Sequence, residues 1–329
     1  MKFKFLTIIS FLAFSWLFIA CSDEDTEDLG NWVKGSEFDG LPRSNGVAFA
    51  IDNNKVYYGT GYSNDEEYFN DLWEFDAEYG YWIQKADFPG SARSGAVSFV
   101  ANGIGYVGTG YDGEEKLNDF YAYNPATNEW TKVADFEGDA RYGAVAFGID
   151  DQGYVGTGYT GNEVKDFWKY DPQSDSWTQI VSIGGSKRRD ATAFVYDGKG
   201  YVCTGTSDGL YNEEMYQYDP YTGFWTQMTD LDDDEDWEVT RKNAVSFVFE
   251  GKAYVGAGEK NGSTINSFWA WNPVTDTWDE VNDFEGAPRS NACSFVTQDK
   301  AYVTGGQYGS YYLDDIWEWR PFEEADNDD

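Results

Sequence analysis

Three tyrosines occupy the same position in three consecutive segments of the sequence. Tyr62, Tyr111 and Tyr159 each directly follow a Gly-Thr-Gly triplet. An aromatic ring in such a position can stack on a sugar or grip a peptide, and the phenol hydroxyl adds a polar contact. The pattern predicts a ligand site, and packing of the same rings over neighbouring loops is the structural alternative.

Polar and charged side chains form a second group of candidates, because they follow an Arg that recurs along the chain. This Arg begins the pattern Arg-x-x-small-x-small-Phe six times, at Arg43, Arg93, Arg141, Arg188, Arg241 and Arg289. Amide, guanidinium and carboxylate groups beside aromatic rings suit a glycan or a peptide ligand. The predicted contacts are Tyr142, Arg189, Asp190, Lys242, Asn243, Asn291 and, after the last glycine pair, Tyr308.

An acidic insertion lengthens one interval of the pattern, the one between Trp225 and Arg241. Six Asp or Glu residues lie between positions 230 and 236, and Trp237 follows them. Carboxylates could bind Ca²⁺, but the insertion lacks the spaced ligands and the central Gly of an EF-hand loop. We expect a solvated acidic loop with Trp237 as an exposed contact.

Composition excludes several kinds of chemistry. The 329 residues include no His, the commonest general base and transition-metal ligand. We therefore predict neither a metal centre nor a cofactor. The formal net charge of −36 repels nucleic acid and anionic membranes, and its simplest role is solubility.

The elements that must position the candidates recur about every 50 residues, which is the spacing of a repeat architecture. Each unit has four short alternating stretches separated by turn residues, as in one blade of a β-propeller. Loops that follow the second strands and links that join the blades then share one rim. We call this rim the upper face, and it should carry the candidate residues.

The repeat resembles the kelch repeat, in which a glycine pair ends the second strand and a Trp lies on the fourth. A Tyr precedes each glycine pair here, and the fourth-strand residues are Trp82, Trp130, Trp177, Trp225 and Trp278. Only Gly305-Gly306 is a true doublet. The other five units read Gly-Thr-Gly, Gly-Ala-Gly or Cys-Thr-Gly at this position. The resemblance covers residues 31–321 and implies an all-β, six-bladed kelch-type propeller.

The ends of the chain should close the ring. The sixth unit has no Trp at the fourth-strand position, whereas Trp32 precedes Arg43 by the same eleven residues that separate Trp82 from Arg93. An N-terminal strand is therefore expected to complete the last blade and to cover its open edge.

The recurring Arg is expected to be structural. Five of the six units carry an acid just before the third strand, and Ser267 is the exception. Because a ligand site is rarely sixfold, we predict buried Arg–carboxylate pairs. Cys203 and Cys293 lie in predicted strands as small core residues, and a disulfide between them is left open.

The first residues read as an export signal. Residues 1–20 have two Lys and an apolar run, and Leu17-Phe18-Ile19-Ala20-Cys21 resembles a bacterial lipobox. We predict a signal peptide over 1–20, an acidic tether over 21–30 after lipidated Cys21, the propeller over 31–321 and an acidic tail over 322–329. The acidic tract after Cys21 favours the outer surface of the outer membrane, with a periplasm-facing location as the alternative. The lipid anchor would be the only contact with the membrane.

These observations predict a monomeric, non-catalytic binding module whose ligand, protein or peptide or glycan, is held on the upper face. Among kelch-like propellers, the copper oxidases that act on galactose need His and are excluded. A bacterial sialic-acid epimerase (mutarotase) also has a six-bladed kelch fold, so a sugar enzyme of that kind is the alternative function. No specific motif for that activity is visible.

Overall fold

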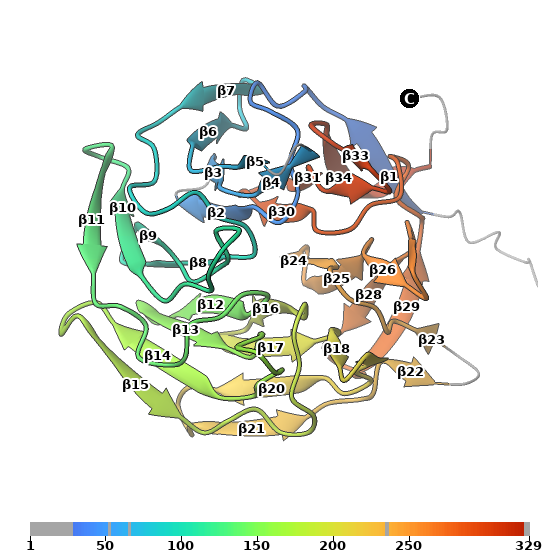
Figure 1. Cartoon of the computed structure of the whole chain (residues 1–329). Coiled ribbons are helices and arrows are strands. Elements are labelled where there is room, and N and C mark those ends of the chain that lie inside the picture. The colour runs from blue at the N-terminus through green and yellow to red at the C-terminus, as the bar shows by residue number, and fades with distance from the viewer. Residues whose placement is uncertain (1–28, 52–53, 65–66, 234–236, 326–329) are drawn as a thin grey trace, which may run out of the picture.

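The computed structural model describes residues 29–325, apart from 52–53, 65–66 and 234–236. Six four-stranded antiparallel sheets are arranged radially around a central axis (Figure 1). The predicted six-bladed, all-β propeller is confirmed. Cys21 and the leader lie outside the described residues. Within the described part of the chain, no helix has the length and apolar character needed to cross a membrane.

Each blade contributes four strands from the axis to the periphery, and we number the blades in chain order. The innermost strands are β2 (Val47–Ile51), β8 (Val97–Ala101), β12 (Val145–Ile149), β16 (Thr192–Tyr196), β24 (Val245–Phe249) and β30 (Cys293–Val296). The second strands are β3 (Lys55–Gly59), β9 (Ile104–Gly108), β13 (Gln152–Gly156), β17 (Lys199–Cys203), β25 (Lys252–Gly256) and β31 (Ala301–Thr304).

The outer half of each blade consists of a third and a fourth strand. The third strands are β6 (Leu72–Asp76), β10 (Phe120–Asn124), β14 (Phe167–Asp171), β20 (Tyr216–Asp219), β28 (Phe268–Asn272) and β34 (Ile316–Glu324). The fourth strands are β7 (Tyr81–Gln84), β11 (Glu129–Val133), β15 (Ser176–Ile180), β21 (Phe224–Gln227), β29 (Thr277–Val281) and β1 (Leu29–Lys34).

Five short hairpins decorate the blades. Four of them follow second strands and stand on the upper face: β4 (Tyr62–Ser63) with β5 (Glu67–Tyr68), β18 (Thr206–Ser207) with β19 (Leu210–Tyr211), β26 (Glu259–Lys260) with β27 (Ser263–Thr264), and β32 (Gln307–Tyr308) with β33 (Tyr311–Tyr312). The fifth, β22 (Asp232–Asp233) with β23 (Trp237–Glu238), belongs to the acidic insertion. The turns between first and second strands lie at the opposite end, which we call the lower face.

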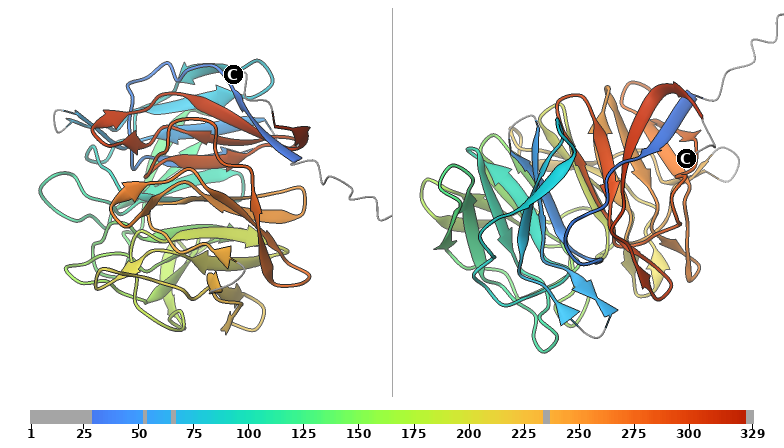
Figure 2. Two further views of the ribbon diagram at one scale, coloured as in Figure 1. Left: turned by 90° about the vertical axis from the view of Figure 1, so that its right-hand side faces the viewer. Right: turned by 90° about the horizontal axis from the view of Figure 1, so that it is seen from above.

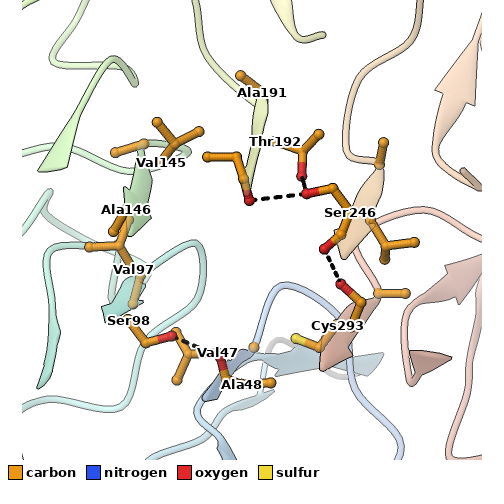
Figure 3. A pocket seen from close by; sticks show the side chains of 18 residues that line it. Val47, Ala48, Val97, Ser98, Val145, Ala146, Ala191, Thr192, Ser246 and Cys293 are labelled. Carbon is orange, nitrogen blue, oxygen red and sulfur yellow. Dashed lines mark hydrogen bonds between the residues drawn. The ribbon is translucent and has the colours of Figure 1, made fainter. Parts of the chain in front are cut away.

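Small side chains line the central channel, where the six inner strands crowd together (Figure 3). The channel encloses a cavity of about 220 Å³. Hydroxyl groups tie neighbouring strands across it: Ser98 Oγ donates to the Ala48 carbonyl at 3.0 Å, and Ser294 Oγ donates to the Ser246 carbonyl at 2.8 Å. The side chains that face the channel are therefore small, because the six strands approach one another closely there.

The N-terminal strand completes blade six, as the interval from Trp32 to Arg43 predicts. β1 pairs antiparallel with β34, with Trp32 opposite Trp319, so the first and last strands lie side by side (Figure 1). Trp32 is fully buried, and its ring centroid lies 4.9 Å from those of Phe268 and Phe284 in blade five. β1 begins at Leu29 and β34 ends at Glu324, so the two strands extend slightly beyond the limits of 31 and 321 expected for the propeller.

Each recurring Arg is fully buried within its blade, and five of the six pair with a carboxylate. Arg141, for example, donates from both terminal nitrogens to Asp166, at 2.7 and 2.8 Å. Burial alone would raise the pKa of Asp166, but the hydrogen bonds and charge of Arg141 hold it below its ordinary value. The structural interpretation of the recurring Arg is confirmed.

Arg241 in blade five lacks a carboxylate partner, because Ser267 stands at the acidic position. Its guanidinium donates to the Ser267 carbonyl at 2.8 Å and to Ser267 Oγ at 3.2 Å. Burial without a compensating charge lowers the pKa of Arg241 to about 10, which still leaves it charged at neutral pH. Blade five therefore holds a desolvated guanidinium without the carboxylate that neutralises its counterpart in each of the other five blades.

Replacing Ser267 with Asp should stabilise the protein. A hydrogen bond to a charged group contributes about 1.5–3 kcal/mol, so we expect the free energy of unfolding to rise by about that amount. Urea denaturation measures it, with Ser267→Asn as the uncharged control of similar shape. An increase that Ser267→Asn reproduces would show that the missing charge is irrelevant.

The two described cysteines are free and buried in different blades. Cys203 ends β17 in blade four, and Cys293 begins β30 in blade six. Burial raises the pKa of each thiol to about 12, so both are unreactive. The expected core role is confirmed, and the disulfide that the sequence left open does not form.

Candidate functional site

A closed circle of backbone hydrogen bonds surrounds the upper mouth of the channel. One residue from each blade donates its N–H to the carbonyl of its counterpart in the preceding blade, at 2.9–3.1 Å. All six adopt a left-handed backbone, with φ from 53 to 60°. We call these residues the mouth ring: Asn45, Gly95, Gly143, Asp190, Asn243 and Asn291.

The left-handed conformation explains which residue types occupy the mouth ring. Gly, Asn and Asp are the residues that tolerate it best, so the backbone itself selects them. Three predicted contacts, Asp190, Asn243 and Asn291, therefore have a structural reason for their identity. They also line a cavity of about 110 Å³ at the channel mouth. A Cβ at Gly143 would meet Asp190 Oδ1, so a larger residue there would displace the Asp190 side chain.

Six tyrosines form a continuous arc around one side of the mouth, and we call it the tyrosine arc. Neighbouring ring centroids are 5.0–6.3 Å apart along the order Tyr312, Tyr62, Tyr68, Tyr111, Tyr142 and Tyr159. All six rings are partly buried and partly accessible to solvent. The structure thus brings together the four tyrosines Tyr62, Tyr111, Tyr142 and Tyr159 that the sequence singled out on adjacent blades.

Two members of the arc were missed by the sequence pattern. Tyr68 lies opposite Tyr62 in the β4–β5 hairpin, and Tyr312 lies opposite Gln307 in the β32–β33 hairpin. Tyr312 contacts Tyr62, whereas the predicted Tyr308 is 47% exposed at the hairpin tip. Pairing of residues across each hairpin would have supplied the signal, since it brings the second strand of the hairpin over the arc.

Charged side chains continue the arc on the other side of the mouth. The Arg189 guanidinium lies 4.9 Å from the centre of the Tyr159 ring and near Glu163 and Asp190, with Nε–oxygen distances of 3.6 and 3.5 Å. Lys242 Nζ lies 3.1 Å from Glu259. We call Glu163, Arg189, Asp190, Lys242 and Glu259 the charged sector.

Asp190 is the titratable group of the charged sector most affected by its surroundings. Burial raises the pKa of its carboxyl, Glu163 and Glu259 raise it further, and Arg189 and Lys242 oppose the rise. A desolvated acid at the mouth of a cavity is a typical property of a functional site. Burial likewise raises the pKa of the Tyr142 phenol, which stays a hydrogen-bond donor at neutral pH.

Comparison with known proteins agrees with the blade geometry. The profile of the KLHDC2/KLHL20/DRC7 kelch-repeats domain matches residues 31–187, and the kelch motif matches residues 240–285. The chain belongs to the kelch-repeat β-propellers. A solved structure titled "Structure of YjhT" is similar to this kelch propeller with a TM-score of 0.72 and 19% sequence identity. The match covers 86% of this chain and 95% of the other, and at that identity it shows the fold alone. No curated protein matches the chain significantly by sequence.

The acidic insertion of the kelch propeller lies at the periphery and not at the mouth. The β22–β23 hairpin stands at the outer edge beside β29 (Figure 1). Trp237 is partly buried, and its indole Nε1 donates to the Asp230 carbonyl at 3.0 Å. The structure therefore does not bring Trp237 together with the other predicted contacts. Among the described residues, no three Asp, Glu or Cys side chains are grouped so that they could hold a metal ion, and 234–236 lie outside them.

Proposed function

We propose that this kelch propeller is a non-catalytic binding protein of the bacterial cell envelope whose upper face holds a glycan. The observation that carries the proposal is the tyrosine arc, which ends on the charged sector at the rim of a polar cavity. Aromatic faces beside amide and carboxylate groups suit a ligand with apolar ring faces and many hydroxyl groups. A sugar has both.

A rigid platform supports this function. The mouth ring joins all six blades through backbone hydrogen bonds, so the side chains around it are held with little freedom. Preorganised contacts lose less entropy on binding, which favours affinity for a small polar ligand. A protein partner is the competing ligand, and it would use the exposed hairpin tips at Leu210, Tyr308 and Tyr311.

The proposed location in the envelope rests on the first residues of the chain. The lipobox around Cys21 and the acidic tract after it support a lipoprotein of the outer membrane, with the propeller on the cell surface. A periplasm-facing anchor is the other arrangement. We propose a monomer anchored through its lipid alone.

A glycan array tests the proposed ligand. The array is probed with residues 22–329 and with the matched variant in which Tyr62, Tyr111 and Tyr159 are all replaced by Ala. A reproducible signal that the variant loses supports a glycan-binding propeller. A blank array would sink the glycan ligand and turn the search to protein partners by cross-linking on intact cells.

A sugar enzyme is a second candidate function, and the environment of Asp190 is the observation that favours it. Opening and reclosing a sugar ring needs only a modest acid and a modest base, and a carboxyl with a raised pKa can serve as either. The epimerase-like alternative is tested by following anomer exchange by NMR for any sugar that the array identifies. Exchange no faster than in buffer would leave binding as the only function.

Replacing Asp190 with Asn should weaken ligand binding and stabilise the fold. Because the folded-state pKa of Asp190 is raised, its ionised form opposes folding at neutral pH, and this cost fades as the pH falls through that pKa. We therefore expect the variant to melt at a higher temperature at pH 7. If the ligand donates hydrogen bonds to the ionised carboxylate, wild-type affinity falls on acidification, whereas the affinity of the variant is lower at pH 7 and insensitive to pH. Titration calorimetry from pH 7 to pH 4 measures the affinities of the wild type and the variant, and a thermal melt at pH 7 measures their stabilities. Equal pH profiles of the two affinities would exclude Asp190 from the site.

A further inference from the structure

The first described strand begins on the opposite side of the propeller from the candidate site. β1 starts at Leu29, which pairs with Glu324 near the end of β34. The β4–β5 hairpin projects from one face in Figure 2, right, while the start of β1 points to the other. β1 therefore begins far from the tyrosine arc.

The residues around a pocket at the end of β34 show that β1 begins on the lower face. Phe322 and Glu323 line it together with Glu250 and Asp299, which lie in the turns between the first and second strands of blades five and six. These turns define the lower face. Phe322 is 70% exposed there, and Leu29, which pairs with the last residue of β34, is 46% exposed.

The chain between the lower face and the predicted lipid is short. Eight peptide steps separate Leu29 from Cys21, so a fully extended tether reaches about 26–29 Å and a flexible one about 16 Å on average. The inner strand of one blade alone spans about 17 Å, and turns and hairpins lengthen the blade at both ends. An average tether is thus too short to let the upper face turn round to the bilayer.

We propose that the tether holds the lower face against the membrane and points the tyrosine arc away from it, into the surrounding medium. This orientation rests on the lipidation of Cys21 proposed above, and it does not depend on what the upper face binds. Four carboxylates and one cation line the lower pocket, Glu250, Asp299, Glu318 and Glu323 with Arg320, so its net negative charge does not attract this face to anionic lipids. The tether, not adhesion, sets the orientation.

Fluorescence quenching in lipid vesicles tests the orientation on the full-length chain. Single labels are placed at the two ends of blade six with Asp299→Cys on the lower face and Ser310→Cys on the upper hairpin, both at exposed positions. The buried Cys203 and Cys293 should not react with the dye. Acylated protein is reconstituted into phosphatidylcholine vesicles that contain a headgroup spin-labelled lipid.

Quenching at position 299 is expected to exceed that at 310 by at least threefold. Equal quenching, or stronger quenching at 310, would overturn the orientation. A mass spectrum without acyl chains on Cys21 would overturn it for a different reason, because nothing would then tie Leu29 to the bilayer. A flexible insertion of about 30 Gly and Ser residues after Asp28 should bring the two signals together, since the average reach roughly doubles. An unchanged ratio would show that the tether is not the cause.

Discussion

Replacing Trp32 with Ala is expected to lower the free energy of unfolding by about 3–5 kcal/mol, the usual cost of removing a large buried aromatic side chain. Trp32 is fully buried between blades five and six. Its ring lies 4.9 Å from the Trp319 ring and equally close to Phe268 and Phe284. The cavity left by Ala would open at the one junction where the two ends of the chain meet.

Equilibrium denaturation measures this loss, and Tyr221→Ala supplies the control. Tyr221 is 97% exposed on a turn, so its removal should change stability by no more than about 0.5 kcal/mol. Deleting residues 31–35 should cost more than Trp32→Ala, because the outer edge of β34 would lose its partner. Closure by β1 would be refuted by a truncated chain that melted at the wild-type temperature.

Most of the fold follows from the sequence, because each blade is a unit with its own internal pattern. The recurring Arg, the glycine pair and the fourth-strand Trp fix the strand order within a blade, and their spacing fixes the number of blades. The signal for ring closure is equally local, since Trp32 precedes Arg43 by the same number of residues as Trp82 precedes Arg93. None of these inferences required a contact between distant residues to be known in advance.

The mouth ring could be predicted only in part. Each of its residues stands two positions after a recurring Arg, and all six are Asn, Gly or Asp, the types that accept a left-handed backbone. From the sequence, three of the six residues, Asp190, Asn243 and Asn291, are predicted as ligand contacts, and their backbone role is not apparent. Its hydrogen bonds join residues about one blade apart, and only the closed ring brings their backbones together. Side-chain patterns within one blade do not contain that information.

The tyrosine arc shows the same limit in another form. Tyr62, Tyr111 and Tyr159 share a sequence position, whereas Tyr68 and Tyr312 enter the arc through hairpins of different length. Hairpin register depends on the turn, and the turns after the second strands vary from blade to blade. Variation between repeats therefore concentrates on the upper face, where it can produce a specific site on a repeated scaffold.

The three tyrosines that share a sequence position are alternate members of the arc. Tyr62 contacts Tyr68 and Tyr312, Tyr111 contacts Tyr68 and Tyr142, and Tyr159 contacts Tyr142 and Arg189. Replacing these three with Ala removes one partner from every ring contact in the arc. The remaining rings would stand isolated around a widened mouth, without a continuous surface on which a sugar chain could stack.

The triple substitution Tyr62→Ala, Tyr111→Ala and Tyr159→Ala is expected to weaken glycan binding at least about a hundredfold, because three aromatic contacts of about 1 kcal/mol or more are lost together. Titration calorimetry with a glycan from the array measures the affinity, and a thermal melt verifies that the variant is folded. The matched control replaces Tyr79, Tyr81 and Tyr221, which are exposed on or beside turns between third and fourth strands, and should bind as the wild type does. Equal losses in the two triple variants would mean that the effect comes from lost aromatic surface in general. Wild-type affinity in the arc variant would place the glycan site elsewhere on the propeller and would refute the tyrosine arc as the binding surface.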